Sequence, residues 1–182
     1  MGLDIFAAGN LERVGDIDWD DEGINIVHDE FDYCDLEEGR YESNGEYYSF
    51  RAGSYSGYNQ FRKLLSLAAN GISDSDVWES PDSSVSLPFY YLINFSDCEG
   101  TIGPGVAELL WDQFTTHRSR VIININDEPD LGKETGDPIA FETEFGIEFE
   151  LSPEDIEYFI QVYDDFTEAC RIAKDDGIIR FC

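Results

Sequence analysis

The sequence predicts a single α+β domain over residues 1–182, in which a mixed or antiparallel sheet packs against about three helices. Short segments of strand length, apolar or alternating, are interspersed with longer segments whose apolar residues recur at helical spacing. Their expected order, βββαβαββαβ, departs from the regular alternation of a parallel sheet. The chain also has an ordinary length for one domain, and neither a repeat nor a long linker divides it.

The first expected elements are strands. Residues 3–7 form a short apolar run, and residues 24–27 form another. Residues 46–52 (EYYSFRA) combine aromatic side chains with period-two alternation, which is typical of a half-buried strand that ends at Gly53.

A helix is expected next, with Ser56 at its N-cap and Asn70-Gly71 at its end, because apolar residues between them recur at helical spacing. Residues 72–87 are rich in Ser, Asp and Pro and predict a loop with one turn. Residues 88–95 (PFYYLINF) form an apolar run of strand length, which predicts a central strand.

An amphipathic helix is predicted over residues 106–118. Residues 121–125 could extend this helix or form a strand, and their β-branched side chains favour the strand. Residues 139–151 alternate apolar and acidic side chains, which predicts one strand with a solvated acidic face.

The longest helix is expected to begin near Ser152 and to end near Gly177. Ser152 suits the N-cap, Pro153 suits the first helical position, and the acidic side chains that follow favour the positive end of the helix dipole. Residues 178–181 predict a terminal strand.

The chain is strongly acidic, with 40 Asp+Glu, 11 Lys+Arg and a formal net charge of −29. Such a surface repels nucleic-acid phosphates, so no direct binding to nucleic acid is expected, and a partner selected by charge should be basic. The acidity has three possible explanations: adaptation to salt or plain solubility, recognition of a basic protein, or mimicry of a nucleic acid. The densest acidic stretch covers residues 16–46.

The sequence predicts a cytoplasmic protein without membrane segments. It contains neither the long apolar run of a membrane helix nor the basic start and apolar run of a signal peptide. The four cysteines lack C-x-x-C spacing, so neither a metal nor another cofactor is expected, and the thiols are expected to be buried or idle.

The first polar motif, FRAGSYSGYNQFR over residues 50–62, joins a strand to a helix. A glycine-bearing turn before a helix exposes backbone amides that can bind an anion. The two arginines could form a positive pocket, or they could pair with nearby carboxylates while the glycines merely turn the chain. The candidate binding residues here are Arg51, Ser54, Tyr55, Tyr58, Asn59 and Arg62.

The second polar motif, NFSDCEGTIGP, covers residues 94–104. Its acidic side chains could bind a cation, act as acid and base, or accept hydrogen bonds from Arg51. In a structural role, its serine and aspartate would cap the turn and the following helix. The candidate binding residues here are Asn94, Ser96, Asp97 and Glu99.

The two motifs are expected to share one site, because they leave strands that we expect to be adjacent. Arg51 or Arg62 should then lie within hydrogen-bonding distance of Asp97 or Glu99, or of a ligand that bridges them. Elsewhere the two histidines form no recognisable triad, and no catalytic sequence motif is present. No catalytic residue is therefore expected.

Taken together, the segments MGLDIF, FRAGSYSGYNQFR and FYYLINFSDCEGTIGP and the acidic C-terminal helix with its short strand resemble a family of uncharacterised bacterial and phage proteins. More distantly, the same order is similar to small immunity proteins of polymorphic toxin systems. The acidic stretch 16–46 and residues 121–151 have no counterpart in that pattern.

The resemblance and the acidic charge together predict a non-catalytic binding protein that neutralises a macromolecular partner, in the manner of an immunity protein or a phage anti-defence protein. The expected partner is a basic toxin or effector. The alternative is a small-molecule binder, such as a sponge for a nucleotide signal, in which Arg51 and Arg62 hold phosphate and Tyr55 or Tyr58 stacks on a base. A hydrolase that uses Asp97 and Glu99 is a weaker alternative.

Overall fold

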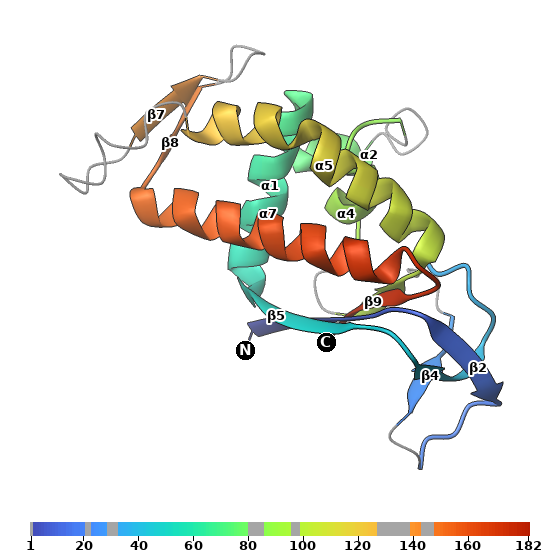
Figure 1. The fold of residues 1–182 in the computed structure, drawn as a ribbon. Helices are drawn as coiled ribbons and strands as arrows, with labels where there is room; N and C mark the ends of the chain where they lie inside the picture. The colour runs from blue at the N-terminus through green and yellow to red at the C-terminus, as the bar shows by residue number, and fades with distance from the viewer. Residues whose placement is uncertain are drawn as a thin grey trace. The chain divides into compact units, whose positions relative to one another are not determined.

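The computed structural model describes residues 2–20, 23–28, 33–79, 86–95, 99–126, 139–142 and 148–182, with the side chains of 123–126, 139–142, 148 and 149 excluded. Its strands pair in antiparallel sheets, and five strands precede the first helix instead of alternating with helices, so the α+β class is confirmed (Figure 1). Among the described residues, no helix is both long enough and apolar enough to cross a membrane.

The chain forms two compact units. The first comprises Met1–Tyr58, Phe95–Asp112 and Asp165–Cys182, and the second comprises Asn59–Asn94 and Gln113–Asp164. Three helices contribute residues to both units: α1 (Tyr55–Asn70), α5 (Pro104–Asn126) and α7 (Pro153–Ala173). The number of domains therefore stays a prediction.

The first unit contains a four-stranded antiparallel sheet. In spatial order its strands are β5 (Tyr47–Ser54), β1 (Gly2–Ala8), β9 (Ile178–Phe181) and β6 (Gly100–Ile102). The predicted strands at 3–7, 46–52 and 178–181 are thereby confirmed.

A three-stranded antiparallel sheet also belongs to the first unit, in the order β2 (Leu11–Gly15), β4 (Gly39–Ser43) and β3 (Ile24–Ile26). The predicted strand at 24–27 corresponds to β3. Strands β2 and β4 were not predicted, because their side chains are mostly polar and only pairing between the strands reveals them.

Aromatic rings fill the core of the first unit. Phe181 on β9 lies 6.0 Å from Phe166, 5.9 Å from Tyr58 and 4.6 Å from Phe95, measured between ring centroids. Phe50 on β5 meets Phe166 edge-on at 5.0 Å. The C-terminal part of α7 therefore covers the face of the sheet to which Phe50 and Phe181 point.

On the same face, the Tyr48 hydroxyl donates a hydrogen bond of 2.6 Å to Asp165. This bond, with burial, raises the pKa of Tyr48 from 10.0 to about 12. An unfolded chain releases the phenolic proton near pH 10, while the folded chain retains it, so the stability present below pH 10 is lost as the pH rises from 10 to about 12. In urea titrations, the free energy of unfolding of Tyr48→Phe should fall less over this pH interval than that of the wild type.

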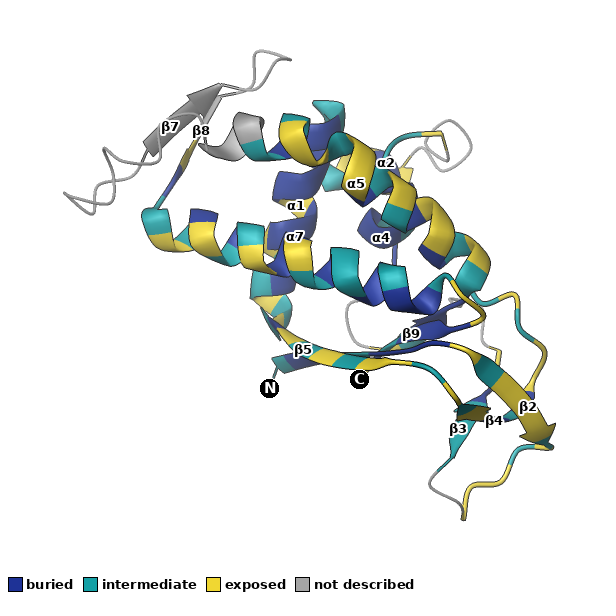
Figure 2. Ribbon diagram, viewed as in Figure 1, coloured by how far each residue is buried: buried dark blue, intermediate teal, exposed yellow. Residues whose placement is uncertain are grey.

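The second unit has its own aromatic core. Phe114 lies 4.8 Å from Phe89 and 4.7 Å from Tyr163, between ring centroids, and the Tyr163 hydroxyl donates to the Phe114 carbonyl at 2.7 Å. Phe61 packs against Phe159 at 5.1 Å. Figure 2 shows both buried and exposed sides on α5 and α7, as expected of amphipathic helices.

Residues 88–95 do not form the predicted central strand. They contain a short helix, α4 (Tyr90–Ile93), preceded by Phe89 with a left-handed backbone (φ 62°). The Phe89 amide donates to Gln113 Oε1 at 2.8 Å, and the Ile93 amide donates to the Phe89 carbonyl at 2.9 Å. A buried apolar run of this length has no periodicity that separates a strand from a buried helix, and tertiary contacts decide between them.

The strand favoured at 121–125 is also absent, because α5 continues to Asn126. With 23 residues, α5 is longer than α7 with 21, so the expectation that the helix after Ser152 is the longest was wrong. The start of α7 is confirmed: Asp155 N donates to Ser152 Oγ at 3.1 Å, and Ser152 N donates back to Asp155 Oδ2 at 3.2 Å. The helix ends at Ala173, ahead of a turn that leads to Gly177.

Instead of one strand at 139–151, the structure has two, β7 (Ile139–Glu142) and β8 (Glu148–Leu151), which pair with each other. Alternation runs along both arms, so the pattern alone could not distinguish a hairpin from one long strand. In the loop predicted at 72–87, the expected turn is the short helix α2 (Asp74–Glu79).

Candidate functional site

The first polar motif joins β5 directly to α1. The helix begins at Tyr55, and the Gly57 amide donates to Ser54 Oγ at 3.1 Å, so Ser54 and not Ser56 supplies the cap. Gly53 has a φ of 85°, a backbone conformation that glycine adopts easily, and it lies within β5 rather than ending it. The glycine-bearing segment thus redirects the chain into the helix.

The Ser54 cap gives a direct test of this assignment. Ser54→Ala should lower the free energy of unfolding by about 1 kcal/mol, because it leaves an amide at the helix start without its acceptor. Ser56→Ala should have a clearly smaller effect, since Ser56 Oγ contacts only Ser54 Oγ among its described hydrogen bonds. Urea unfolding of both variants measures the difference, and equal effects would contradict the assignment.

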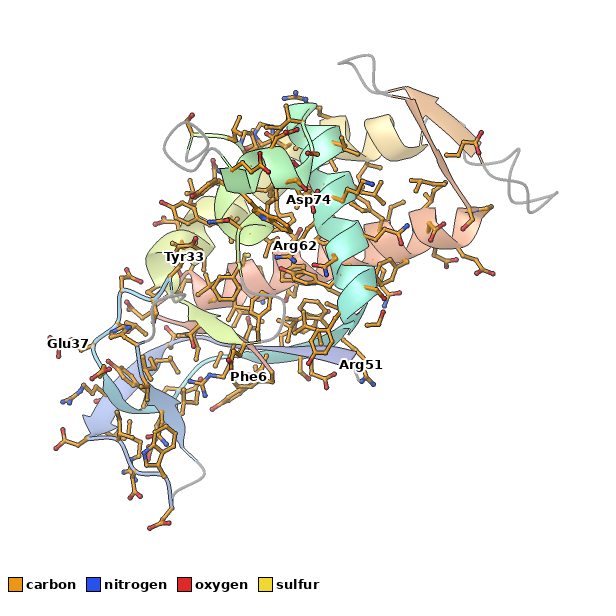
Figure 3. The ribbon with its side chains drawn as sticks, turned by 180° about the vertical axis from the view of Figure 1, so that it is seen from behind. Phe6, Tyr33, Glu37, Arg51, Arg62 and Asp74 are labelled. Atoms are coloured by element: carbon orange, nitrogen blue, oxygen red, sulfur yellow. The ribbon has the colours of Figure 1, made fainter. Side chains whose placement is uncertain are left out.

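Arg51 lies on β5 with its side chain 62% exposed, and its Nε is 3.7 Å from Asp4 Oδ1 on the adjacent strand β1. The carboxylate is equally exposed, so the pair contributes little to stability. Figure 3 shows Arg51 projecting from the end of the sheet. Arg51 is therefore available to an outside partner.

Arg62 has different surroundings, because it is only 4% exposed. It donates to the Ile93 carbonyl at 3.4 Å and to Asn59 Oδ1, and its guanidinium lies 5.4 Å from the centre of the Trp78 ring. These contacts connect α1, α2 and α4 within the second unit, which is a structural role.

The tyrosines of the motif also differ. Tyr58 is fully buried and packs against Phe166 and Phe181, so it cannot stack on a base as proposed for the nucleotide alternative. Tyr55, at the first position of α1, is half-buried.

The second polar motif is described only in part, because Ser96 and Asp97 lie outside the described residues. Asn94 donates through Nδ2 to the Tyr90 hydroxyl at 3.4 Å. Glu99 is exposed and immediately precedes β6. β6, which was not predicted from the sequence, lies within this motif, and α5 begins at the last residue of the motif, Pro104.

The N-terminus of α5 instead meets a residue from a distant part of the chain. The Gly105 amide donates to Asp35 Oδ1 at 3.4 Å, and an added Cβ at Gly103 would clash with the same oxygen. A carboxylate at this position favours the positive end of the helix dipole. No sequence signal links Asp35 to a helix about 70 residues away.

The two motifs do not leave adjacent strands, so this expectation was wrong. Arg51 lies on β5 and Gly100 on β6, at opposite edges of the four-stranded sheet, with β1 and β9 between them. Three strand spacings amount to roughly 14 Å, which is too far for direct pairing between Arg51 and Glu99.

A different group of charged side chains gathers around the three-stranded sheet. Between Leu11 and Ser43, the described residues include eight exposed acidic side chains and two arginines. The acidic ones, named here the acidic face, are Glu12, Asp16, Asp18, Asp20, Asp35, Glu37, Glu38 and Glu42. Figure 3 shows Glu37 at the outside of this region.

Within the acidic face, Glu12 on β2 stands directly opposite Glu42 on β4. Cross-strand partners have Cβ atoms about 5 Å apart, and like charges in such a pair are destabilising. Arg13 does not neutralise this pair, since its Nη2 contacts Asp16 at 3.2 Å and its Nε donates to the Glu38 carbonyl.

Trp19 projects from the turn that follows β2 and is 76% exposed. The turn is ordered by its neighbours, because Asp18 N donates to Asn25 Oδ1 at 3.1 Å and Asn25 Nδ2 donates to the Asp18 carbonyl at 2.7 Å. A large aromatic side chain presented on an anchored turn is typical of residues that dominate binding energy at protein interfaces.

No family model, curated protein or solved structure matches this chain. The resemblance to immunity proteins therefore stays a prediction, and the geometry of the described residues has to support any functional proposal.

Proposed function

We propose that this protein is a non-catalytic acidic binding protein that neutralises a basic macromolecular partner, such as a toxin or effector. The observation that carries the proposal is the Glu12–Glu42 pair within the acidic face. A directly opposed like-charge pair lowers the stability of the sheet, and a cationic side chain from a partner would remove that repulsion.

Trp19 offers a partner an apolar contact in addition to the charged contacts of the acidic face. Electrostatic attraction speeds association and selects the partner, while buried aromatic anchors provide most of the affinity. The acidic face and Trp19 lie within the same stretch of chain, so a basic surface with an apolar pocket fits both features.

The small-molecule alternative receives less support from the described residues. Arg62 and Tyr58 are buried in structural contacts, which leaves Arg51 and Tyr55 as the accessible residues of that motif.

Affinity capture from the native host tests the proposal. The tagged protein should retain a basic protein at low salt and lose much of it at high salt, because screening weakens attraction between exposed charges. Two variants with the same net charge serve as baits, since replacing four acids changes −29 to −25 in each. The test variant is Glu12→Gln, Asp20→Asn, Glu37→Gln and Glu42→Gln, and the control variant is Glu79→Gln, Glu108→Gln, Glu150→Gln and Glu157→Gln.

Retention should fall for the test variant and persist for the control variant. Equal retention by both would show that overall charge, and not the acidic face, attracts the partner. Failure of the wild-type bait to retain any basic protein at low salt would overturn the proposed function.

A further inference from the structure

We propose that Trp19, together with the carboxylates of Asp18 and Asp20, binds an arginine side chain of the basic partner. The inference rests on the proposed function and deepens it, because it names the group on the partner that meets Trp19. Arginine combines an aliphatic stem, which can lie against the indole ring, with a planar cation that the carboxylates attract.

The other two tryptophans of the chain each hold a cation over their ring. The Arg62 guanidinium lies 5.4 Å from the centre of the Trp78 ring. The Lys174 ammonium lies 5.0 Å from the centre of the Trp111 ring. The face of an indole ring attracts cations at such distances. Trp19 differs, because it is 76% exposed and no cation of the described residues lies over its ring, which leaves the ring available to a partner.

In one of these two cases a carboxylate helps the ring to hold its cation. Lys174 Nζ lies over Trp111 and also contacts Asp175 Oδ1 at 3.1 Å. At Trp19, the residues on either side in the chain are exposed aspartates. Neither aspartate forms an ion pair within the part of the chain that the structure describes. The turn therefore presents an aromatic face and carboxylates without the cation that completes the arrangement at Trp111.

The turn that carries Trp19 is held in place before a partner arrives. Asp18 Oδ1 accepts the Asp20 amide at 3.0 Å, so this carboxylate lies beside the backbone of Trp19. Two hydrogen bonds between Asp18 and Asn25 tie the same turn to β3. Figure 2 shows the segment that follows β2 exposed along most of its length. A preorganised site of this kind loses less conformational freedom when it binds.

The exposure of the ring favours arginine over lysine. A cation that stacks on the ring has to give up part of its hydration shell, and a guanidinium is more weakly hydrated than an ammonium. The guanidinium is also planar, and it pairs with a carboxylate through two parallel hydrogen bonds. An arginine stacked on Trp19 would therefore retain N–H groups for Asp18 or Asp20.

Two end-capped peptides of equal charge test this preference: one repeats glycine and arginine four times, and the other repeats glycine and lysine four times. In calorimetry at low salt, the arginine peptide should bind the wild-type protein about fivefold more tightly, because stacking adds to the charge attraction that both peptides share. In NMR spectra, the indole N–H signal that is absent from Trp19→Leu should shift when the arginine peptide is added. The other two indole signals should stay in place.

Substitutions of the ring locate the preference on the protein. Trp19→Leu should bind both peptides equally, because leucine offers an apolar contact without an aromatic face. Trp19→Phe should restore part of the preference, since the ring of phenylalanine attracts cations more weakly than indole. Tyr47→Leu is the matched control, because it removes an exposed aromatic ring outside the acidic face, and it should keep the preference within about twofold of the wild type. Native circular dichroism spectra of the variants establish that they fold.

A charge-matched pair of double variants tests the carboxylates. The test variant is Asp18→Asn with Asp20→Asn, and the control is Glu108→Gln with Glu157→Gln, since replacing two acids changes −29 to −27 in each. Asparagine retains a side-chain acceptor for the amide of residue 20. The test variant should bind the arginine peptide about fivefold more weakly, and the control should change its affinity by less than about twofold. Equal changes in both would overturn the role of these two carboxylates.

Equal binding of the two peptides by the wild type, an unmoved Trp19 indole signal, or a preference that survives in Trp19→Leu would each overturn the arginine inference. A basic protein captured from the host that binds Trp19→Leu as tightly as the wild type would overturn this inference while the proposed function stands. Absence of any captured basic protein, with the arginine preference at Trp19 intact, would overturn the proposed function alone.

Discussion

Neutralising four carboxylates of the acidic face should weaken binding of the basic partner by about tenfold to a thousandfold, because interfacial charge pairs contribute up to several kcal/mol. The variant is Glu12→Gln, Asp20→Asn, Glu37→Gln and Glu42→Gln, measured by calorimetry against the captured protein at low and high salt. The difference between variant and wild type should shrink at high salt.

The same substitutions should not destabilise the protein. Glu12→Gln alone should raise the free energy of unfolding by about 0.2–1 kcal/mol, since it removes one member of a directly opposed like-charge pair. A gain in stability with a loss of affinity distinguishes a binding role from a structural one. Lower stability together with unchanged affinity would contradict the interpretation of the acidic face.

Phe181→Ala should lower the free energy of unfolding by about 3–5 kcal/mol, because it removes a buried ring and leaves a cavity. The ring is 2% exposed and contacts Tyr58, Phe95 and Phe166. Urea unfolding measures the change from the transition midpoint at constant slope.

Tyr47→Ala is the matched control for Phe181→Ala. It removes an aromatic ring of similar size from the same sheet, but from an exposed position, so the change should stay below about 1 kcal/mol. Similar losses for both variants would show that the ring cluster around Phe181 is not the main core of the first unit.

Local patterns in the sequence determined several elements. Ser152, Pro153 and the following acids predicted the start of α7, because the groups that cap a helix are adjacent in the chain. The alternation in β5 and the apolar terminal strand were equally informative, since one buried face gives a strand its period of two.

Tertiary contacts decided the conformation of the segments whose sequence patterns fit both a helix and a strand. Residues 88–95 became a turn and a short helix through contacts such as Phe89 with Gln113, and residues 121–125 continued α5 against their β-branched preference. Strands β2, β4 and β6 depend on partners far away in the sequence, which a single stretch of residues does not reveal.

The same distinction between sequence and tertiary structure applies to the candidate site. The sequence by itself determined the acidic charge and located its densest stretch, because charge depends on composition. It also indicated Arg51 and Arg62 as candidate binding cations, but only burial separated the exposed Arg51 from the buried Arg62 and Tyr58. The Trp19 turn is anchored by hydrogen bonds between Asp18 and Asn25, which the sequence did not indicate. The Glu12–Glu42 opposition was decided by strand pairing, which joins residues about 30 positions apart, so no local spacing rule could have predicted it.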